Sequence, residues 1–166
     1  MKTFMRYSVL MLLMVAYSVF GHGSTAAGKV ISVIDGNTVE VFTSEKEVIV
    51  VVLADIDCPE LTQDFGSEAK EFLEKLALKK DVLIEFVGKD RKGNNLGIVL
   101  IKGKTDARVA LLQQGLAWTA EKNPNPNLEI HRTSAQEEGR GLWKFENPTP
   151  PWVYRRQQSM LQPKSS

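Results

Sequence analysis

Alternating apolar and polar positions predict three strands in the first part of the chain. The alternation runs through residues 29–34 and 38–43, and the tight-turn sequence Asp35-Gly36-Asn37 joins them. Residues 48–56 form a longer apolar run rich in β-branched side chains, so we expect a third strand that ends before Pro59. Short connections between three strands indicate an antiparallel meander, which needs further partners to be stable.

The pattern then changes to a helical period. We expect a helix capped by Ser67, and its apolar face consists of Ala69, Phe72, Leu73 and Leu76. Two more strands follow at 81–87 and 96–101, joined by a polar loop. Thr105 and Asn127 are the expected caps of a second and a third helix.

This order of elements predicts an α+β fold with five antiparallel strands and three helices. Five strands with an intervening helix fit a small Greek-key barrel of the OB type. The prediction places this domain at residues 28–146. Residues 147–166 are rich in proline and polar groups, so we expect a flexible C-terminal tail.

The first 27 residues are typical of a signal peptide. Lys2 and Arg6 precede an apolar run of 14 residues, and small residues then offer a cleavage site after Ala26 or Ala27. We therefore expect a secreted or periplasmic protein. A retained N-terminal anchor is the alternative, but the apolar run is shorter than the roughly 20 residues of a membrane span. No stable span is expected in the mature form.

Loss of this leader changes the charge of the protein. Lys2 and Arg6 are its only charged residues, so the formal net charge falls from +1 to −1. Proteins that capture nucleic acid through its phosphates usually carry a basic surplus or patch, and the mature chain has no such surplus. Cys58 is the only cysteine, which excludes an internal disulfide. It is either a small buried residue or an exposed reactive thiol.

Four short motifs resemble the thermonuclease, or staphylococcal nuclease, family. They are Ile34-Asp35-Gly36-Asn37-Thr38-Val39, Ala54-Asp55-Ile56-Asp57-Cys58-Pro59-Glu60, Asp90-Arg91-Lys92-Gly93-Asn94 and Gln114-Gly115-Leu116-Ala117. They occur in the family's order at compatible spacing, across about residues 28–145. The resemblance implies a five-stranded OB barrel with three helices. It also implies a site for calcium-assisted cleavage of DNA and RNA phosphodiesters.

Part of the family's site is present. By resemblance, Asp57 matches a metal-binding aspartate, Glu60 matches the proposed general base, and Cys58 falls where a backbone carbonyl helps to hold the metal. The family's first turn is Asp-Gly-Asp-Thr, and its second aspartate also binds metal. Asn37 stands at that position. An amide offers an oxygen without negative charge, so we expect weak calcium binding at most.

The cationic part of the family's site is missing. Val52 and Asn94 stand where the family carries its two catalytic arginines. Loss of one such electrostatic donor lowers a rate by roughly 10²-fold or more. The family's base-stacking tyrosines are also absent, because Glu121 and Asn123 stand in their places, and a carboxylate there opposes a phosphate-rich ligand.

Two replacements for the lost groups are conceivable from the sequence. Asp55 and Asp57 share a face if the segment is extended, about 7 Å apart, so Asp55 is a candidate for the charge missing at Asn37. Arg91 and Lys92 are candidate nucleic-acid-binding residues that could stand in for the arginine missing at Asn94. Each has a simpler alternative as a solvated side chain.

These losses lead to two hypotheses. The first is an exported pseudonuclease that uses its OB barrel as a binding module for nucleic acid, a protein or an envelope component. The second is an active calcium-dependent endonuclease with relocated cations. The first hypothesis assumes that the pocket lacks positive groups. A guanidinium or ammonium group beside Asp57 and Glu60, supplied from another part of the chain, would undo this argument for the first hypothesis.

Overall fold

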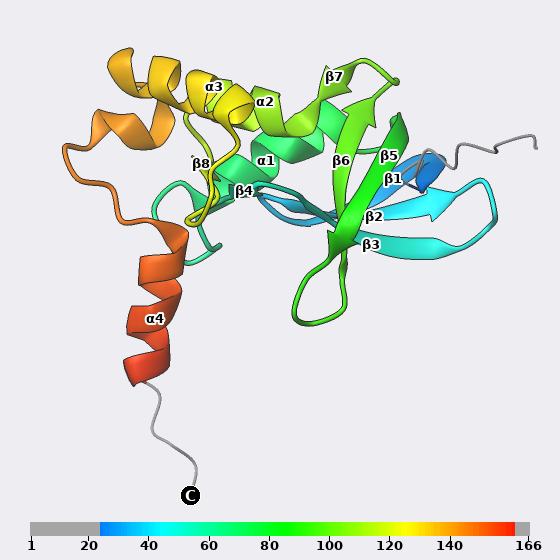
Figure 1. The fold of residues 1–166 in the computed structure, drawn as a ribbon, viewed down its shortest axis with the longest axis horizontal. Coiled ribbons are helices and arrows are strands. Elements are labelled where there is room, and N and C mark those ends of the chain that lie inside the picture. The colour runs from blue at the N-terminus through cyan, green and yellow to red at the C-terminus, as the bar shows by residue number, and fades with distance from the viewer. Residues whose placement is uncertain (1–23, 162–166) are drawn as a thin grey trace, which may run out of the picture.

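The computed structural model describes residues 24–161 and contains a closed barrel of five long strands (Figure 1). The sheet order is β3-β2-β1-β5-β6, and a parallel pairing of β3 with β6 closes it. The five strands are β1 (Thr25–Asp35), β2 (Thr38–Thr43), β3 (Val48–Leu53), β5 (Asp81–Lys89) and β6 (Asn95–Ile101). The predicted α+β OB barrel is confirmed.

Inward-facing β-branched residues fill the barrel. They are fully buried and come from four of the strands: Val30, Val39, Val41, Val51 and Ile84. Alternation along each strand sends these side chains inward and their neighbours outward. Burial of such a side chain contributes about 1.5–3 kcal/mol. The alternating pattern therefore sets both the strands and the core.

Helices cover one end of the barrel, and each begins at a different residue from the one predicted. They are α1 (Gly66–Ala77), α2 (Ala107–Gln113) and α3 (Pro126–Glu137), followed by the 3₁₀ helix η1 (Gly141–Lys144). The N-caps are Phe65, Asp106 and Asn125 rather than Ser67, Thr105 and Asn127. Asp106 and Asn125 each accept a hydrogen bond from a backbone N–H two residues on, as good N-caps do.

Three two-residue strands complete the described part of the fold. They are β4 (Ile56–Asp57), β7 (Thr105–Asp106) and β8 (Trp118–Thr119). The motif Ala54–Glu60, called the acidic motif below, contains β4, and the pairing of β4 with β8 places its Asp57 beside Trp118, in the segment that follows α2. This β4–β8 pairing joins the barrel to the helices at the place where the candidate functional site, described below, lies.

The C-terminal segment differs from the prediction of a flexible tail. Pro151–Leu161 forms a fourth helix, α4, which projects away from the other helices (Figure 1). Proline is favoured in the first turn of a helix because its N–H has no partner there in any case. The prolines of this segment therefore mark a helix start. Within residues 24–161, no helix has the length and apolar character needed to span a bilayer.

The start of the domain also differs. β1 begins at Thr25, and Thr25, Ala26 and Ala27 pair with β5. The predicted boundary at residue 28 therefore falls inside a strand. The apolar run of the predicted leader lies outside the described residues.

Candidate functional site: an acidic motif and an arginine from the last helix

The acidic motif lies directly against the first turn of the barrel. The buried Cys58 thiol donates to the carbonyl of Gly36 at 3.2 Å. A Cβ atom at Gly36 would come within 2.7 Å of the Cβ of Cys58, so only glycine allows this approach. The contact brings Asp35-Gly36-Asn37 beside Asp57-Cys58-Pro59-Glu60. Two of the predicted motifs therefore meet in space.

Of the two alternatives for Cys58, a small buried residue or an exposed reactive thiol, the structure shows the buried residue. Its exposed fraction is 2%, and burial raises the pKa of its thiol well above the ordinary value. A thiol that stays protonated and inaccessible is a poor nucleophile and a poor metal ligand. Its side chain serves packing, consistent with the backbone role that the resemblance assigns to this position.

Arg155 of α4 binds two of the three acidic residues of the motif, Asp57 and Glu60. Its Nη1 donates to Asp57 Oδ1 at 3.1 Å and to Glu60 Oε1 at 2.7 Å, and its Nη2 donates to Asp57 Oδ2 at 2.6 Å. Burial raises the pKa of Asp57, and the hydrogen bond from Arg155 opposes this rise. The hydrogen bond to Asp57 raises the pKa of Arg155. The assumption that this pocket lacks a positive group is wrong.

Several contacts hold α4 in this position. The Trp152 ring packs edge-on against Trp118 of β8, with 5.7 Å between ring centroids. The Tyr154 hydroxyl lies 2.9 Å from Thr62 Oγ1, in the loop after Glu60. Trp118 also packs against Trp143, with centroids 4.5 Å apart. The three tryptophans therefore pack together and help to anchor α4.

A second arginine of α4, Arg156, forms an ion pair with Glu121. Arg156 Nη1 donates to Glu121 Oε1 at 3.1 Å. The sequence indicated that a carboxylate at this position opposes a phosphate-rich ligand. The ion pair neutralises that charge, so the objection to nucleic-acid binding is weaker than it was from the sequence.

The positions of the missing arginines have local structural roles. Val52 lies in β3, paired with Thr38 on one side and Leu96 on the other. Asn94 donates through Nδ2 to Asp90 Oδ2 at 2.9 Å, and this hydrogen bond lowers the pKa of Asp90. Neither residue supplies a charge. That these two positions are those of the family's catalytic arginines stays a prediction from the resemblance.

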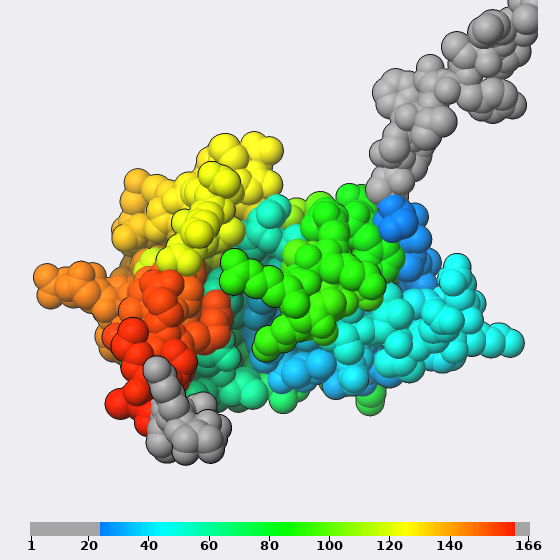
Figure 2. All heavy atoms as spheres, turned by 60° about the horizontal axis from the view of Figure 1, so that its bottom comes forward, coloured from blue at the N-terminus to red at the C-terminus, as the bar shows by residue number. Residues whose placement is uncertain are grey.

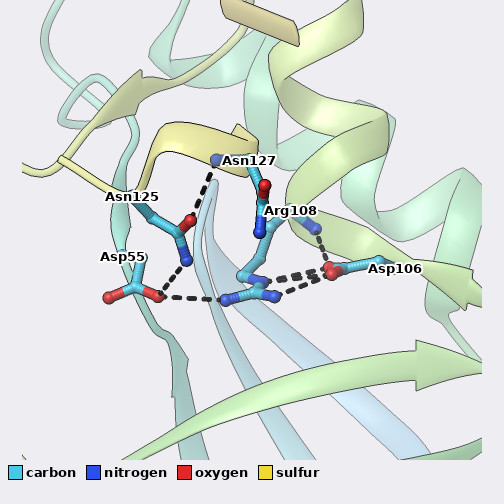
Figure 3. A network of polar contacts seen from close by, with 5 residues as sticks. All are labelled: Asp55, Asp106, Arg108, Asn125 and Asn127. Carbon is cyan, nitrogen blue, oxygen red and sulfur yellow. Dashed lines mark hydrogen bonds and ion pairs between the residues drawn. The ribbon is translucent and has the colours of Figure 1, made fainter. Parts of the chain in front are cut away.

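Asp55 does not lie beside Asp57, although an extended segment would have placed the two side chains on one face. The chain turns at Asp55, whose φ of 62° is left-handed, so the two side chains do not alternate along one extended segment. Asp55 instead accepts hydrogen bonds from Arg108 Nη1 at 3.3 Å and Asn125 Nδ2 at 3.4 Å (Figure 3). The candidate metal ligand therefore belongs to a separate polar network.

Arg91 and Lys92 are exposed residues of the loop between β5 and β6. This loop and α4 project from the same face of the molecule, which Figure 2 turns toward the viewer. Within residues 24–161, no hydrogen bond or ion pair joins either side chain to Asp57 or Glu60. The cation beside the acidic motif comes from α4.

The described residues do not fit a calcium ion in this arrangement. Residues 24–161 contain no group of three or more histidine, cysteine, aspartate or glutamate residues placed to hold a metal. Both oxygens of Asp57 already accept hydrogen bonds from a guanidinium. A divalent cation prefers several carboxylate or carbonyl oxygens and is repelled by a fixed positive charge.

The closed barrel and its acidic motif define an OB-fold domain of the nuclease type. A family model described as staphylococcal nuclease homologue matches residues 50–145. The chain therefore belongs to the staphylococcal nuclease family, whose cleavage chemistry is generally calcium-dependent.

Curated relatives carry nuclease names. The chain is 35% identical over 129 residues to an "Uncharacterized endonuclease" of Escherichia coli O157:H7, covering 77% of this chain and 84% of that protein. It is 33% identical over 133 residues to an "Uncharacterized endonuclease" of Haemophilus influenzae, covering 80% and 74%. It is 31% identical over 140 residues to a "Micrococcal nuclease" of Shigella flexneri, covering 78% and 80%.

Sequence reasoning missed Arg155. The family match ends at residue 145, so α4 lies beyond it. A signal was present, because Pro151 is followed by Trp152 and Tyr154, and proline before amphipathic aromatic residues indicates a helix that packs. The same prolines are also typical of an extended segment, so the sequence alone does not distinguish a helix from a flexible tail.

Proposed function

We propose that this chain is a pseudonuclease, a domain of the staphylococcal nuclease family that binds nucleic acid without efficient hydrolysis. The observation that supports it is the guanidinium of Arg155 on both oxygens of Asp57 and on Glu60. The reason for impaired catalysis differs from the one that the sequence suggested. The pocket has a cation, but that cation binds the groups on which the family's chemistry depends.

Each of those groups is less able to act. Both oxygens of Asp57 accept a hydrogen bond from Arg155, and the positive charge of the guanidinium opposes a metal ion at the same carboxylate. Glu60 must accept a proton from water to act as a general base, and one of its oxygens already accepts from a guanidinium. Asn37 adds no negative charge. Weak metal binding and a hindered base together predict slow hydrolysis.

The active endonuclease is the second candidate, and the same arginine favours it. A guanidinium beside Glu60 is a relocated cation of the kind that this hypothesis requires. In that case Arg155 leaves the carboxylates and stabilises charge on the phosphoryl oxygens during the reaction. The relatives named as endonucleases are consistent with this alternative.

A cleavage assay separates the two candidates. Mature protein and the Glu60→Gln variant are incubated with single-stranded DNA in calcium and in EDTA. We expect the unaltered protein to show no more calcium-dependent cleavage than the Glu60→Gln variant. Calcium-dependent cleavage by the unaltered protein that disappears in Glu60→Gln and in Arg155→Ala would establish the endonuclease and overturn the pseudonuclease.

Binding to nucleic acid is tested separately. Gel-shift titrations at several salt concentrations should show affinity that falls steeply with salt, because phosphate contacts release counterions. A protein or envelope partner predicts no retardation of oligonucleotides in this assay. Export also belongs to this proposal, motivated by Lys2, Arg6 and the apolar run that follows. N-terminal sequencing of the mature protein checks it.

A further inference from the structure

Arg155 has hydrogen-bonding capacity that its carboxylate partners do not use. A guanidinium carries five N–H donors. Three of them bind Asp57 and Glu60. The Nε–H and the second Nη2–H have no hydrogen-bond partner within residues 24–161. The side chain is 48% exposed, so these two donors belong to a group that solvent and ligands reach.

These two donors point in the same direction. The Nε and Nη2 atoms form one edge of the planar guanidinium, and two parallel N–H groups on such an edge match two oxygens of a carboxylate or phosphate. Arg108 shows this use in the same molecule. Its Nε and Nη2 donate to the two oxygens of Asp106, at 3.3 and 2.8 Å for Oδ2 and 3.1 Å for Oδ1. In Arg155 the equivalent edge is open.

The charges of the site are consistent with Arg155 in a metal's position. By resemblance, the family surrounds a divalent cation with two aspartates and a glutamate, which leaves one net negative charge. Here Asp57 and Glu60 surround one guanidinium, and Asn37 replaces the third carboxylate. One carboxylate fewer and one positive charge fewer leave the same net charge. The substitution at Asn37 and the contact with Arg155 therefore compensate each other.

We propose that the guanidinium of Arg155 takes the place of the family's metal ion and makes nucleic-acid binding independent of metal. Asp57 and Glu60 orient the guanidinium through one side. The open Nε–H and Nη2–H edge binds two non-bridging oxygens of a nucleic-acid phosphate. This inference rests on the proposed function and identifies Arg155 as the residue that binds the nucleic acid. Arg155 is a binding residue here, and no bond is made or broken.

The test measures binding of a short fluorescent oligothymidylate by anisotropy, in EDTA and in calcium. We expect equal affinity in both. Arg155→Lys keeps the charge but loses the paired donors, and Arg155→Gln loses both. Each should weaken binding by about tenfold or more, the scale of one charge-assisted bidentate contact. Arg140→Gln, at an exposed arginine whose partners are Glu138 and the backbone carbonyl of Gln113, is the matched control and should bind within about twofold of the unaltered protein.

Two further probes identify the phosphate that is bound. An oligothymidylate with an uncharged methylphosphonate backbone should bind poorly, because it lacks the paired anionic oxygens. A 5′-phosphorylated probe separates a terminal monoester from an internal diester. If only the phosphorylated probe depends on Arg155, the edge takes chain ends. If both probes depend on it equally, the edge takes the backbone.

The outcomes distinguish this inference from the proposed function. Binding that requires calcium, or binding that Arg155→Lys and Arg155→Gln leave unchanged, overturns the role of Arg155 even if the protein does not cleave DNA. Cleavage in the earlier assay overturns the pseudonuclease even if Arg155 binds phosphate. Circular dichroism and the thermal midpoint of each variant verify folding, so that a loss of binding is assigned to the side chain.

Discussion

Two arginine clusters in this protein use the same chemical groups in different surroundings. Arg108 of α2 binds Asp106 and Asp55, and its side chain is 7% exposed (Figure 3). Arg155 of α4 binds Asp57 and Glu60, and its side chain is 48% exposed. In the first cluster, both edges of the guanidinium have carboxylate partners. In the second cluster, one edge is open.

The difference separates a structural cluster from the cluster that we propose binds a ligand. A buried guanidinium must have partners for its donors, because an unpaired charge in the interior is strongly unfavourable. Arg108 meets this requirement with the residue that caps its own helix and with the turn at Asp55. An exposed guanidinium has water for its remaining donors, so it can exchange water for a ligand. Burial therefore decides which of the two arginines is available to a phosphate.

The largest predicted effect is on the buried cluster. Arg108→Ala removes the partner of Asp106 and Asp55 and should lower the free energy of unfolding by about 3 kcal/mol, the scale for breaking a buried ion pair. Urea denaturation followed by tryptophan fluorescence measures it. Arg155→Ala is the matched comparison. A loss for Arg108→Ala no larger than for Arg155→Ala would contradict the structural role assigned to Arg108.

An intermediate effect is predicted for the anchor of α4. Trp152→Ala removes the edge-on contact with Trp118 and should lower the free energy of unfolding by about 1–2 kcal/mol, for a half-buried aromatic residue. It should also weaken oligonucleotide binding as Arg155→Gln does, because α4 no longer holds the guanidinium in place. The Arg108 cluster should be unaffected. Full binding by Trp152→Ala would mean that the position of α4 is unimportant for the site.

Arg155→Ala should have the smallest effect on the free energy of unfolding, and it should also change the pKa of Asp57. An exposed ion pair contributes at most about 1 kcal/mol, so the midpoint of urea denaturation should move little. Burial already raises the pKa of Asp57 above its ordinary value of 3.8, and Arg155 opposes that rise. The variant should raise this pKa further. Carbon-13 NMR of the Asp57 carboxyl group measures it.

The sign of the pH dependence follows from this direction. Because the folded pKa of Asp57 lies above its unfolded value, the folded state holds this proton more tightly. The contribution of Asp57 to stability therefore falls as the pH rises from about 4 through the folded pKa. In Arg155→Ala the fall should extend to higher pH. A pKa for Asp57 that stays the same or falls in the variant contradicts the ion pair.

Local sequence patterns predicted the barrel because the relevant information is local. Alternation in residues 38–43 places every second side chain of β2 in the core, whereas in β1 a register irregularity separates the two buried residues Val30 and Val33 by three positions. The prediction that Asp55 lies beside Asp57 was wrong because it also depended on local backbone conformation. The prediction assumed an extended segment from 48 to 56, but β3 ends at Leu53 and the backbone turns before Asp57.

The cation of the candidate site was beyond this kind of reasoning. Arg155 contacts Asp57 across 98 positions of sequence, and no periodicity links the two residues. The family motifs showed where arginines were missing, at Val52 and Asn94, and drew attention to the loop with Arg91 and Lys92. A charge supplied from another helix follows only from the way α4 packs on Trp118.

The attachment of α4 has a consequence for proteolysis. A connector over residues 145–150, with Glu146, Asn147 and Thr149 exposed, joins η1 to α4. Exposed connectors of this kind are favoured cleavage sites. One cut there leaves every long strand intact and leaves α4 attached only through its non-covalent contacts, such as Trp152 with Trp118. If the proposed function holds, we expect such a clipped chain to bind polyanions less well and divalent ions better, because Asp57 and Glu60 lose the guanidinium when α4 departs.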